Sequence, residues 1–385
     1  MSFLPSPARC CAALALGLLL IPVHAGTPKI EGEDVSASLE GLRAKAGLPG
    51  IVCMAFQEGE VVAWGAAGVR AQGSEDPMTI DDPVHMGSCA KAMTSTMIAH
   101  LIEQEVLTWE TTLAQAMPEF AGGVDEGYHD ITIETFLKHQ AGIAERRRPE
   151  IAAHHGLLQS LKGTPQEVRL KVLAQVLSTP PSPSAEGAFD YSNFGYMVAG
   201  AMVETLTKTT WEELMAKELF GPLEMTSAGI GSPSGEHVPV GHTFEDGSYQ
   251  ALPPGPGGAL PEAMGPAGLA HCNLKDWGIF VAEHLAGERG DDGLLTAANY
   301  QRLHTDHGGS KYAAGWGLGH HIWSWGEAKT ITHNGSDNTW LSLVFAIPEW
   351  DLTIMVATNC ASPTANTTIE AAKKLLLKTV GFSKD

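Results

Sequence analysis

The hydrophobic period of this 385-residue chain changes twice, and the order of the changes limits the possible folds. Two short apolar runs, 50–55 and 61–69, flank a Glu58-Gly59 turn and indicate a β-hairpin near the N-terminal end. From about 101 to 269 the spacing is mostly helical, and segments between 315 and 358 again read as strands. Strands at both ends with helices between them predict an α+β protein, an α/β/α sandwich. Its central antiparallel sheet is built from both chain ends, flanked by helices, and carries an inserted helical lobe.

The same patterns suggest how the chain is divided. Helices are expected at 34–46 before the hairpin, at 92–106, and at 367–379 near the C-terminal end. No Ser/Gly linker or charge block interrupts the chain, so residues 26–385 are expected to form a single domain. Within it we expect a sheet lobe at about 30–95 and 290–385, and a helical lobe at about 96–285.

Residues 1–25 have the character of a secretory signal. Arg9 precedes an apolar run, 11–23, that ends in Val23-His24-Ala25, so cleavage is expected after Ala25. The run is short for a membrane span. We therefore expect an exported protein, periplasmic or extracellular, with no stable membrane span after cleavage.

Composition narrows the class further. The chain is 44% hydrophobic and 18% charged, which is typical of a globular enzyme rich in loops. A formal net charge of -20 repels phosphate backbones, so no nucleic-acid partner is expected. The four cysteines outside the signal, Cys53, Cys89, Cys272 and Cys360, allow three disulfide pairings or can remain small buried side chains.

One serine has a lysine three residues after it, within Gly87-Ser88-Cys89-Ala90-Lys91, and no other serine has that spacing. Because a helix is expected to follow, the amine of Lys91 should lie one turn above the hydroxyl of Ser88. A desolvated amine that accepts the hydroxyl proton makes serine a nucleophile. Ser88 and Lys91 are therefore candidate catalytic residues.

Two further motifs supply the other groups that acyl transfer needs. Tyr191-Ser192-Asn193 precedes an expected helix, and a phenol held near a lysine can relay protons while Asn193 orients Lys91 or a substrate carbonyl. His333-Asn334-Gly335-Ser336 ends an expected strand, where Gly335 would let substrate approach the backbone. The amides of Ser88 and Ser336 could then face one developing oxyanion, and His333 could contact substrate or hydrogen-bond near Tyr191.

These three motifs, in this order, resemble the serine β-lactamase and penicillin-binding-protein superfamily, in its branch of class C β-lactamases, D-alanyl-D-alanine carboxypeptidases and esterases. ITIETFLKHQAGI (131–143), GPLEMTSAGIG (221–231) and GPAGLAHCNLKDW (265–277) are similar to further elements of that family, and the resemblance spans roughly 51–359. It implies an acyl-enzyme on Ser88, catalysis by Ser88, Lys91 and Tyr191, and substrate or oxyanion contacts from Asn193, His333, Gly335 and Ser336. It also implies neighbouring first and last strands, which favours a Cys53–Cys360 disulfide.

One departure affects the expected activity. His333 stands where the β-lactamases carry a lysine that helps hold the substrate carboxylate, and a histidine is only partly charged near pH 7. We therefore predict a serine hydrolase of esterase or peptidase/carboxypeptidase type, which cleaves ester or amide bonds of a small-molecule or peptide substrate. The alternatives are a β-lactamase, or a penicillin-binding sensor that acylates without efficient turnover.

Two other groups of residues are weaker signals. His304-Thr305-Asp306-His307 has no partner motif at ligand spacing, so no metal and no cofactor are expected. Arg146-Arg147-Arg148 could attract an anionic substrate group, although a solvated loop is the simpler interpretation. The natural substrate and the oligomeric state stay open.

Overall fold

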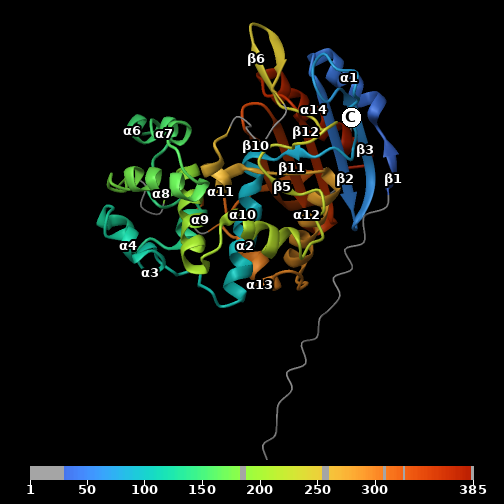
Figure 1. Ribbon diagram of the computed structural model, residues 1–385. Helices are drawn as coiled ribbons and strands as arrows, with labels where there is room; N and C mark the ends of the chain where they lie inside the picture. Colours follow the sequence, from blue (N-terminus) through green and yellow to red (C-terminus); the bar gives the residue numbers. More distant parts are fainter. Residues whose placement is uncertain (1–29, 183–187, 254–259, 307–308, 324–325, 383–385) are drawn as a thin grey trace, which may run out of the picture.

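The computed structural model describes residues 30–182, 188–253, 260–306, 309–323 and 326–382 (Figure 1). The expected signal segment, 1–25, lies outside these ranges. In the part of the chain that the structure describes, no helix has the length and apolar character that a bilayer span requires.

A seven-stranded sheet forms the centre of the molecule, in the order β1-β3-β2-β12-β11-β10-β9. Its strands are β1 (Ile30–Asp34), β2 (Gly50–Gln57), β3 (Glu60–Gly68), β9 (Gly317–Trp323), β10 (Gly326–Ser336), β11 (Leu341–Ile347) and β12 (Leu352–Thr358). The N-terminal hairpin β2–β3 pairs with β12 near the other chain end, which confirms the α+β sheet expected from the sequence. One edge strand, which the sequence did not predict, departs from the antiparallel pattern, since β1 runs parallel to β3. Its sequence, IEGED, is largely polar and gives no strand alternation.

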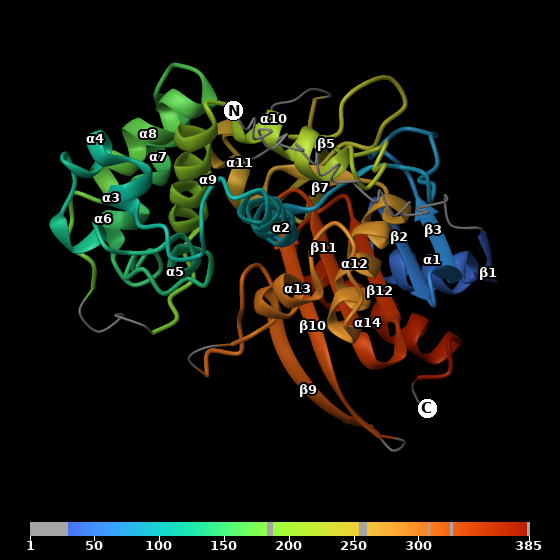
Figure 2. The same ribbon diagram turned by 90° about the horizontal axis from the view of Figure 1, so that it is seen from below.

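Both faces of the sheet are covered by helices, and alternate side chains explain why. On β2, Val52 and Met54 belong to the core that includes α2 (Ala90–Glu103), α12 (Leu274–Arg289) and α13 (Ala297–Leu303). The intervening residues, Ile51 and Cys53, belong to the core formed with α1 (Ser36–Ala46) and α14 (Pro363–Thr379). Figure 2 shows α12 and α13 on one face and α1 on the other. A strand buried on both faces lies at the centre of such a sandwich.

The helical lobe lies beside the sheet in both views (Figures 1 and 2). It comprises α3 (Leu113–Ala116), α4 (Pro118–Ala121), α5 (Ile133–Leu137), α6 (Pro149–Ala152), α7 (His155–Ser160), α8 (Pro165–Val176) and α9 (Asn193–Thr207). Between lobe and sheet lie α10 (Trp211–Met215), its continuation in a π-helical turn (Ala216–Phe220), and α11 (Gly265–Gly268). Two small sheets complete the fold, β4 (Val84–His85) with β8 (Ala270–Cys272) and β5 (Gly229–Ile230), and the hairpin β6 (His242–Glu245) with β7 (Ser248–Ala251).

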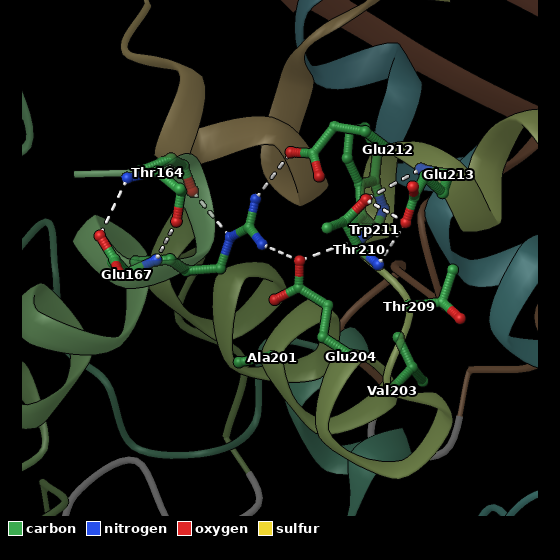
Figure 3. A network of polar contacts seen from close by, with 12 residues as sticks. Thr164, Glu167, Ala201, Val203, Glu204, Thr209, Thr210, Trp211, Glu212 and Glu213 are labelled. Carbon is green, nitrogen blue, oxygen red and sulfur yellow. Dashed lines mark hydrogen bonds and ion pairs between the residues drawn. The ribbon is translucent and has the colours of Figure 1, made fainter.

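A buried ion pair ties the helical lobe to the segment before α11. The Arg169 guanidinium on α8 donates to the Glu204 carboxylate on α9, to Glu212 at 3.1 Å and to the carbonyl of Ala263 at 3.0 Å. Glu204 also accepts from the backbone amide of Trp211 at 2.9 Å, within the network of Figure 3. The side chains of Arg169 and Glu204 are fully buried, so each charge is compensated by its partner and not by water.

The structure contradicts the disulfide between Cys53 and Cys360, because all four described cysteines are free and buried. The sheet register places Cys53 opposite Val356, and Cys360 lies four residues further along the chain, about 13 Å at strand spacing. A disulfide needs its Cα atoms roughly 4–7 Å apart. Burial raises the pKa of the Cys53 thiol to about 12 and that of Cys360 to about 11. These cysteines therefore act as small core side chains.

Candidate active site

Ser88 lies in a 3₁₀ turn, Gly87–Cys89, between β4 and the start of α2. The helix places Lys91 one turn later, and its Nζ donates a hydrogen bond to Ser88 Oγ at 3.1 Å. This local geometry is the one expected from the Ser-x-x-Lys spacing. It brings an amine into direct contact with the only serine that has such a partner in sequence.

Lys91 is fully buried and has three acceptors. Besides Ser88 Oγ, its Nζ donates to Asn193 Oδ1 at 2.8 Å and to the carbonyl oxygen of Ala267 on α11. Three acceptors match the three N–H groups of an ammonium. The amine thus contacts the turn of Ser88, the start of α9 and α11. Its hydrogen bond to Asn193 is the contact that an orienting role for Asn193 would need.

Tyr191 presents its ring to two cations. Lys91 Nζ lies 4.9 Å from the ring centroid, and the guanidinium carbon of Arg146 lies 4.5 Å from it. The ring of His139 packs against Tyr191 with centroids 4.3 Å apart. Among the described residues the phenol oxygen of Tyr191 has no hydrogen-bond partner, so it is available to a molecule in the cleft.

The carboxylate of Glu145 accepts hydrogen bonds from the Tyr-x-Asn segment and from the first residue after it. It accepts from the backbone amides of Asn193 (2.6 Å) and Phe194 (3.3 Å), and from the hydroxyl of Ser192 (2.8 Å). It also accepts from the side-chain amide of Asn193 at 3.1 Å and contacts His155 Nε2 at 2.8 Å. Burial raises the pKa of the Glu145 carboxyl, but the hydrogen bonds from His155 and Ser192 outweigh it and leave the pKa lowered. Glu145 is therefore an anion at the N-terminus of α9, where the helix dipole favours it.

His333 lines the cleft, is largely buried, and has protein partners at both ring nitrogens. Its Nδ1 contacts the carbonyl oxygen of Asn334 at 2.7 Å and its Nε2 lies 3.1 Å from the hydroxyl of Tyr312. A carbonyl only accepts, so Nδ1 carries the proton and Nε2 accepts from Tyr312. Burial, with a smaller contribution from Lys91, lowers the pKa of His333 to about 4. The expectation of a partly charged histidine near pH 7 is thus replaced by an uncharged one.

Two glycines allow the turn of Ser88 to lie against the end of β10. A Cβ on Gly87, whose φ is +50°, would lie 2.4 Å from the amide nitrogen of Ser336. A Cβ on Gly335 would lie 1.9 Å from the carbonyl oxygen of Met86. The hydroxyl of Ser342, which lies opposite Gly335 on the neighbouring strand β11, donates to that same carbonyl at 2.7 Å. The backbone of Ser336 therefore sits beside the turn that carries Ser88, as an oxyanion site built from both would require.

These residues open onto one cleft of about 980 Å³. Of the residues predicted from the sequence, Ser88, Tyr191, Asn193, His333, Gly335 and Ser336 line it. Lys91 lies buried beneath Ser88. The cleft extends across β10 toward the start of α14, where Asn366, Glu370 and Lys373 also line it.

Sequence reasoning missed several residues that support the site. Glu145 and His139 precede the Tyr-x-Asn motif by tens of residues, and Tyr312 belongs to an irregular segment before β9. His139 accepts at Nδ1 from the amide of Ser192 at 3.1 Å, and burial keeps its pKa well below the usual value. A sequence signal existed only for His139, which lies in the 131–143 element.

The histidines considered as metal ligands have other partners. His304 Nε2 lies 2.9 Å from His284 Nδ1, and His304 Nδ1 lies 3.3 Å from Glu288. His307 lies outside the described residues. Within the described ranges no three acidic, histidine or cysteine side chains gather as a metal site would require.

Comparison with known proteins agrees with this fold. The sequence matches the family described as Beta-lactamase over residues 35–378, and the chain belongs to that family. Penicillin-binding protein 4 of Amycolatopsis lactamdurans is 25% identical over 330 residues, which cover 83% of this chain and 83% of that protein. Lovastatin esterase of Penicillium rubens is 25% identical over 246 residues, 60% of this chain and 58% of that protein.

A D-stereospecific amidohydrolase from Streptomyces sp. has a similar fold, with a TM-score of 0.67 and 20% identity. The match covers 87% of this chain and 96% of that one. Fold, family and relatives together make this chain a serine hydrolase of the superfamily that acts on ester and amide bonds.

Proposed function

We propose that Ser88 is the nucleophile of a reaction that cleaves an ester or amide bond through an acyl-enzyme. The observation that carries the proposal is the hydrogen-bonded line from Ser88 Oγ to Lys91 Nζ to Asn193 Oδ1, at 3.1 and 2.8 Å, at the base of the cleft. A serine hydroxyl in contact with a buried amine has the arrangement that activates it.

In the proposed reaction, Ser88 Oγ attacks the carbonyl carbon and gives its proton to the ionised Tyr191 phenol, which the neighbouring Lys91 ammonium stabilises. Tyr191 then passes that proton to the leaving group as the bond to it breaks. Tyr191 is suited to pass a proton to the leaving group, because its phenol faces the cleft and two cations lie against its ring. The amides of Ser88 and Ser336 stabilise the tetrahedral oxyanion. A water molecule then attacks the acyl-enzyme, with Tyr191 as its base, and restores Ser88.

Within this chemistry we infer an esterase or peptidase/amidase rather than a β-lactamase. His333 carries no charge at neutral pH and its ring nitrogens bind Tyr312 and Asn334, so it offers no cation to a substrate carboxylate. The relatives that are named an esterase and an amidohydrolase support this preference. We further infer from residues 1–25 that the protein is exported, to the periplasm or outside the cell.

The first test is hydrolysis of p-nitrophenyl butyrate by the chain without residues 1–25. Ser88→Ala should lower kcat/KM at least about 10³-fold, because the nucleophile is lost, with an unchanged circular dichroism spectrum. Ser178→Ala, at an exposed serine of the helical lobe, is the matched control and should keep full activity.

Intact-protein mass spectrometry distinguishes a hydrolase that releases its acyl group from a protein that stays acylated. A transient acyl adduct that requires Ser88 supports a hydrolase. A stable adduct with no steady-state turnover would instead support a sensor that acylates. Substantial activity in Ser88→Ala would remove Ser88 from the mechanism.

A further inference from the structure

We propose that Arg146 is a specificity-determining residue that binds an anionic group, a carboxylate, on the substrate. The inference rests on the proposed function, because it adds a binding contact to the cleft of Ser88. It begins from the run Arg146-Arg147-Arg148, whose three side chains have different surroundings in the structure.

Two of the three arginines are already paired. Arg147 contacts the Asp190 carboxylate at 2.9 Å. Arg148 contacts Glu150 at 3.0 Å and donates to the carbonyl of Pro180 at 2.9 Å. Arg146 has no carboxylate partner among the described residues, and the neighbouring Glu145 is occupied by the donors that hold the Tyr-x-Asn segment.

Arg146 is exposed at the cleft, and its guanidinium lies against the ring of Tyr191. Its guanidinium carbon lies 4.5 Å from the Tyr191 ring centroid, and the residue lines the cleft together with Ser88. Stacking on an aromatic face engages the plane of a guanidinium and leaves its N–H edge free for acceptors. That edge matches a carboxylate, which can accept two parallel hydrogen bonds from it.

The other cationic groups at the described part of the cleft are already engaged. Lys373 contacts Glu370 at 2.5 Å and lies over the Phe345 ring. Lys91 has three protein acceptors, and His333 is uncharged. At the described part of the cleft, Arg146 is therefore the cationic group that is available to bind a substrate carboxylate. Because the chain carries a net charge of -20, attraction to an anion has to come from such a local contact.

Matched ester pairs test this. In the first pair, mono-p-nitrophenyl glutarate, which carries a carboxylate on its acyl side, is compared with p-nitrophenyl pentanoate. In the second pair, 3-carboxyphenyl pentanoate, which carries a carboxylate on its leaving group, is compared with phenyl pentanoate. For at least one pair, Arg146→Gln should lower the ratio of kcat/KM, anionic over neutral, by about 10- to 100-fold, mainly through KM. Arg146→Lys should retain part of the ratio, and the control Arg148→Gln should leave it unchanged.

Ratios that do not change in Arg146→Gln for either pair, or that fall equally in Arg148→Gln, would overturn the proposal. An equal loss for anionic and neutral esters would also overturn it, since Arg146 would then only position Tyr191.

A second measurement needs no turnover. Calorimetry compares the binding of both anionic esters to Ser88→Ala and to the double variant with Arg146→Gln. Weaker binding of one ester by about 10-fold in the double variant supports the proposal even if the wild-type chain cleaves none of the esters, a result that would count against the proposed function alone. Equal binding of both esters to the two proteins would overturn it.

Discussion

The side chain of Asn193 connects the Glu145 carboxylate to the Lys91 ammonium. Its Nδ2 donates to Glu145 Oε1 at 3.1 Å, and its Oδ1 accepts from Lys91 Nζ at 2.8 Å. An amide cannot turn over between these partners without facing its donor toward the ammonium and its acceptor toward the carboxylate. Glu145 therefore sets the orientation of Asn193 and, through it, the position of the amine beside Ser88.

Glu145→Gln should lower kcat about 10- to 100-fold and change KM little, because a carboxamide presents an N–H donor to some of the donors that Glu145 now accepts. Its free energy of unfolding should fall by about 2–4 kcal/mol, since buried donors lose their acceptor. Steady-state kinetics and urea denaturation measure the two effects. Wild-type kcat in this variant would show that Asn193 is oriented without Glu145.

Gly335→Ala should impair both stability and turnover. The new methyl group would meet the Met86 carbonyl oxygen, which is backbone and cannot rotate away, so β10 and the Ser88 turn must separate. We expect a loss of about 1–3 kcal/mol in unfolding free energy. The loss in kcat should be larger than this destabilisation alone explains, because the Ser336 amide moves. Gly41→Ala, where a Cβ meets nothing within 4 Å, is the control.

His333 should make the protein less stable in mild acid. Its native pKa is about 4, whereas an unfolded histidine titrates near 6.5. Below pH 6.5 the unfolded chain therefore binds a proton that the native state does not, and stability falls as the pH drops toward 4. Between pH 7 and pH 5 this histidine should cost about 2 kcal/mol.

His333→Gln keeps an acceptor for the Tyr312 hydroxyl and should lose that much less stability on acidification than the wild type. Denaturant unfolding at the two pH values measures the difference, and the other histidines cancel because both proteins contain them. Parallel curves would mean that His333 titrates normally in the native state.

The buried pair Arg169–Glu204 should be more costly to break than to replace. Arg169→Met alone leaves an uncompensated carboxylate and should lower the free energy of unfolding by about 3–5 kcal/mol. The double variant with Glu204→Met removes both charges and should lose clearly less than the sum of the two single changes. Chemical denaturation of the four proteins gives the coupling. Additive losses would contradict a direct interaction.

Local patterns in the sequence predicted most of the fold. Hydrophobic period is a property of neighbouring residues, so the hairpin 50–69, the last strands and α14 could be placed before their partners were known. The α+β class followed from their order and is confirmed. The polar strand β1 carried no such pattern and was missed. Register is not local either, and Val356 rather than Cys360 proved to lie opposite Cys53.

In the candidate site too, the residues related by local spacing could be predicted, and those brought together by tertiary packing could not. Ser88 and Lys91 could be paired from spacing alone, because a helix fixes the distance between residues three apart. Glu145 could not, since it is one of 44 acidic residues and approaches Asn193 only when α9 packs beside its loop. The hydrogen bond between Tyr312 and His333 also joins separate elements. Burial, with a smaller contribution from Lys91, lowers the pKa of His333, so this residue of the cleft wall is uncharged at neutral pH.

The pairing of β2 with β12 has a consequence for how the protein is made. The Thr358 hydroxyl donates to the Gly50 carbonyl at 2.6 Å across 308 positions of sequence. At roughly 5–20 residues per second, the inner edge of β2 waits about 15–60 s on the ribosome for its partner strand. During that interval the apolar strand GIVCMAFQ has an unpaired edge, which can pair with other strands or other chains. A chaperone that covers this strand until β12 is available should therefore raise the yield of folded protein.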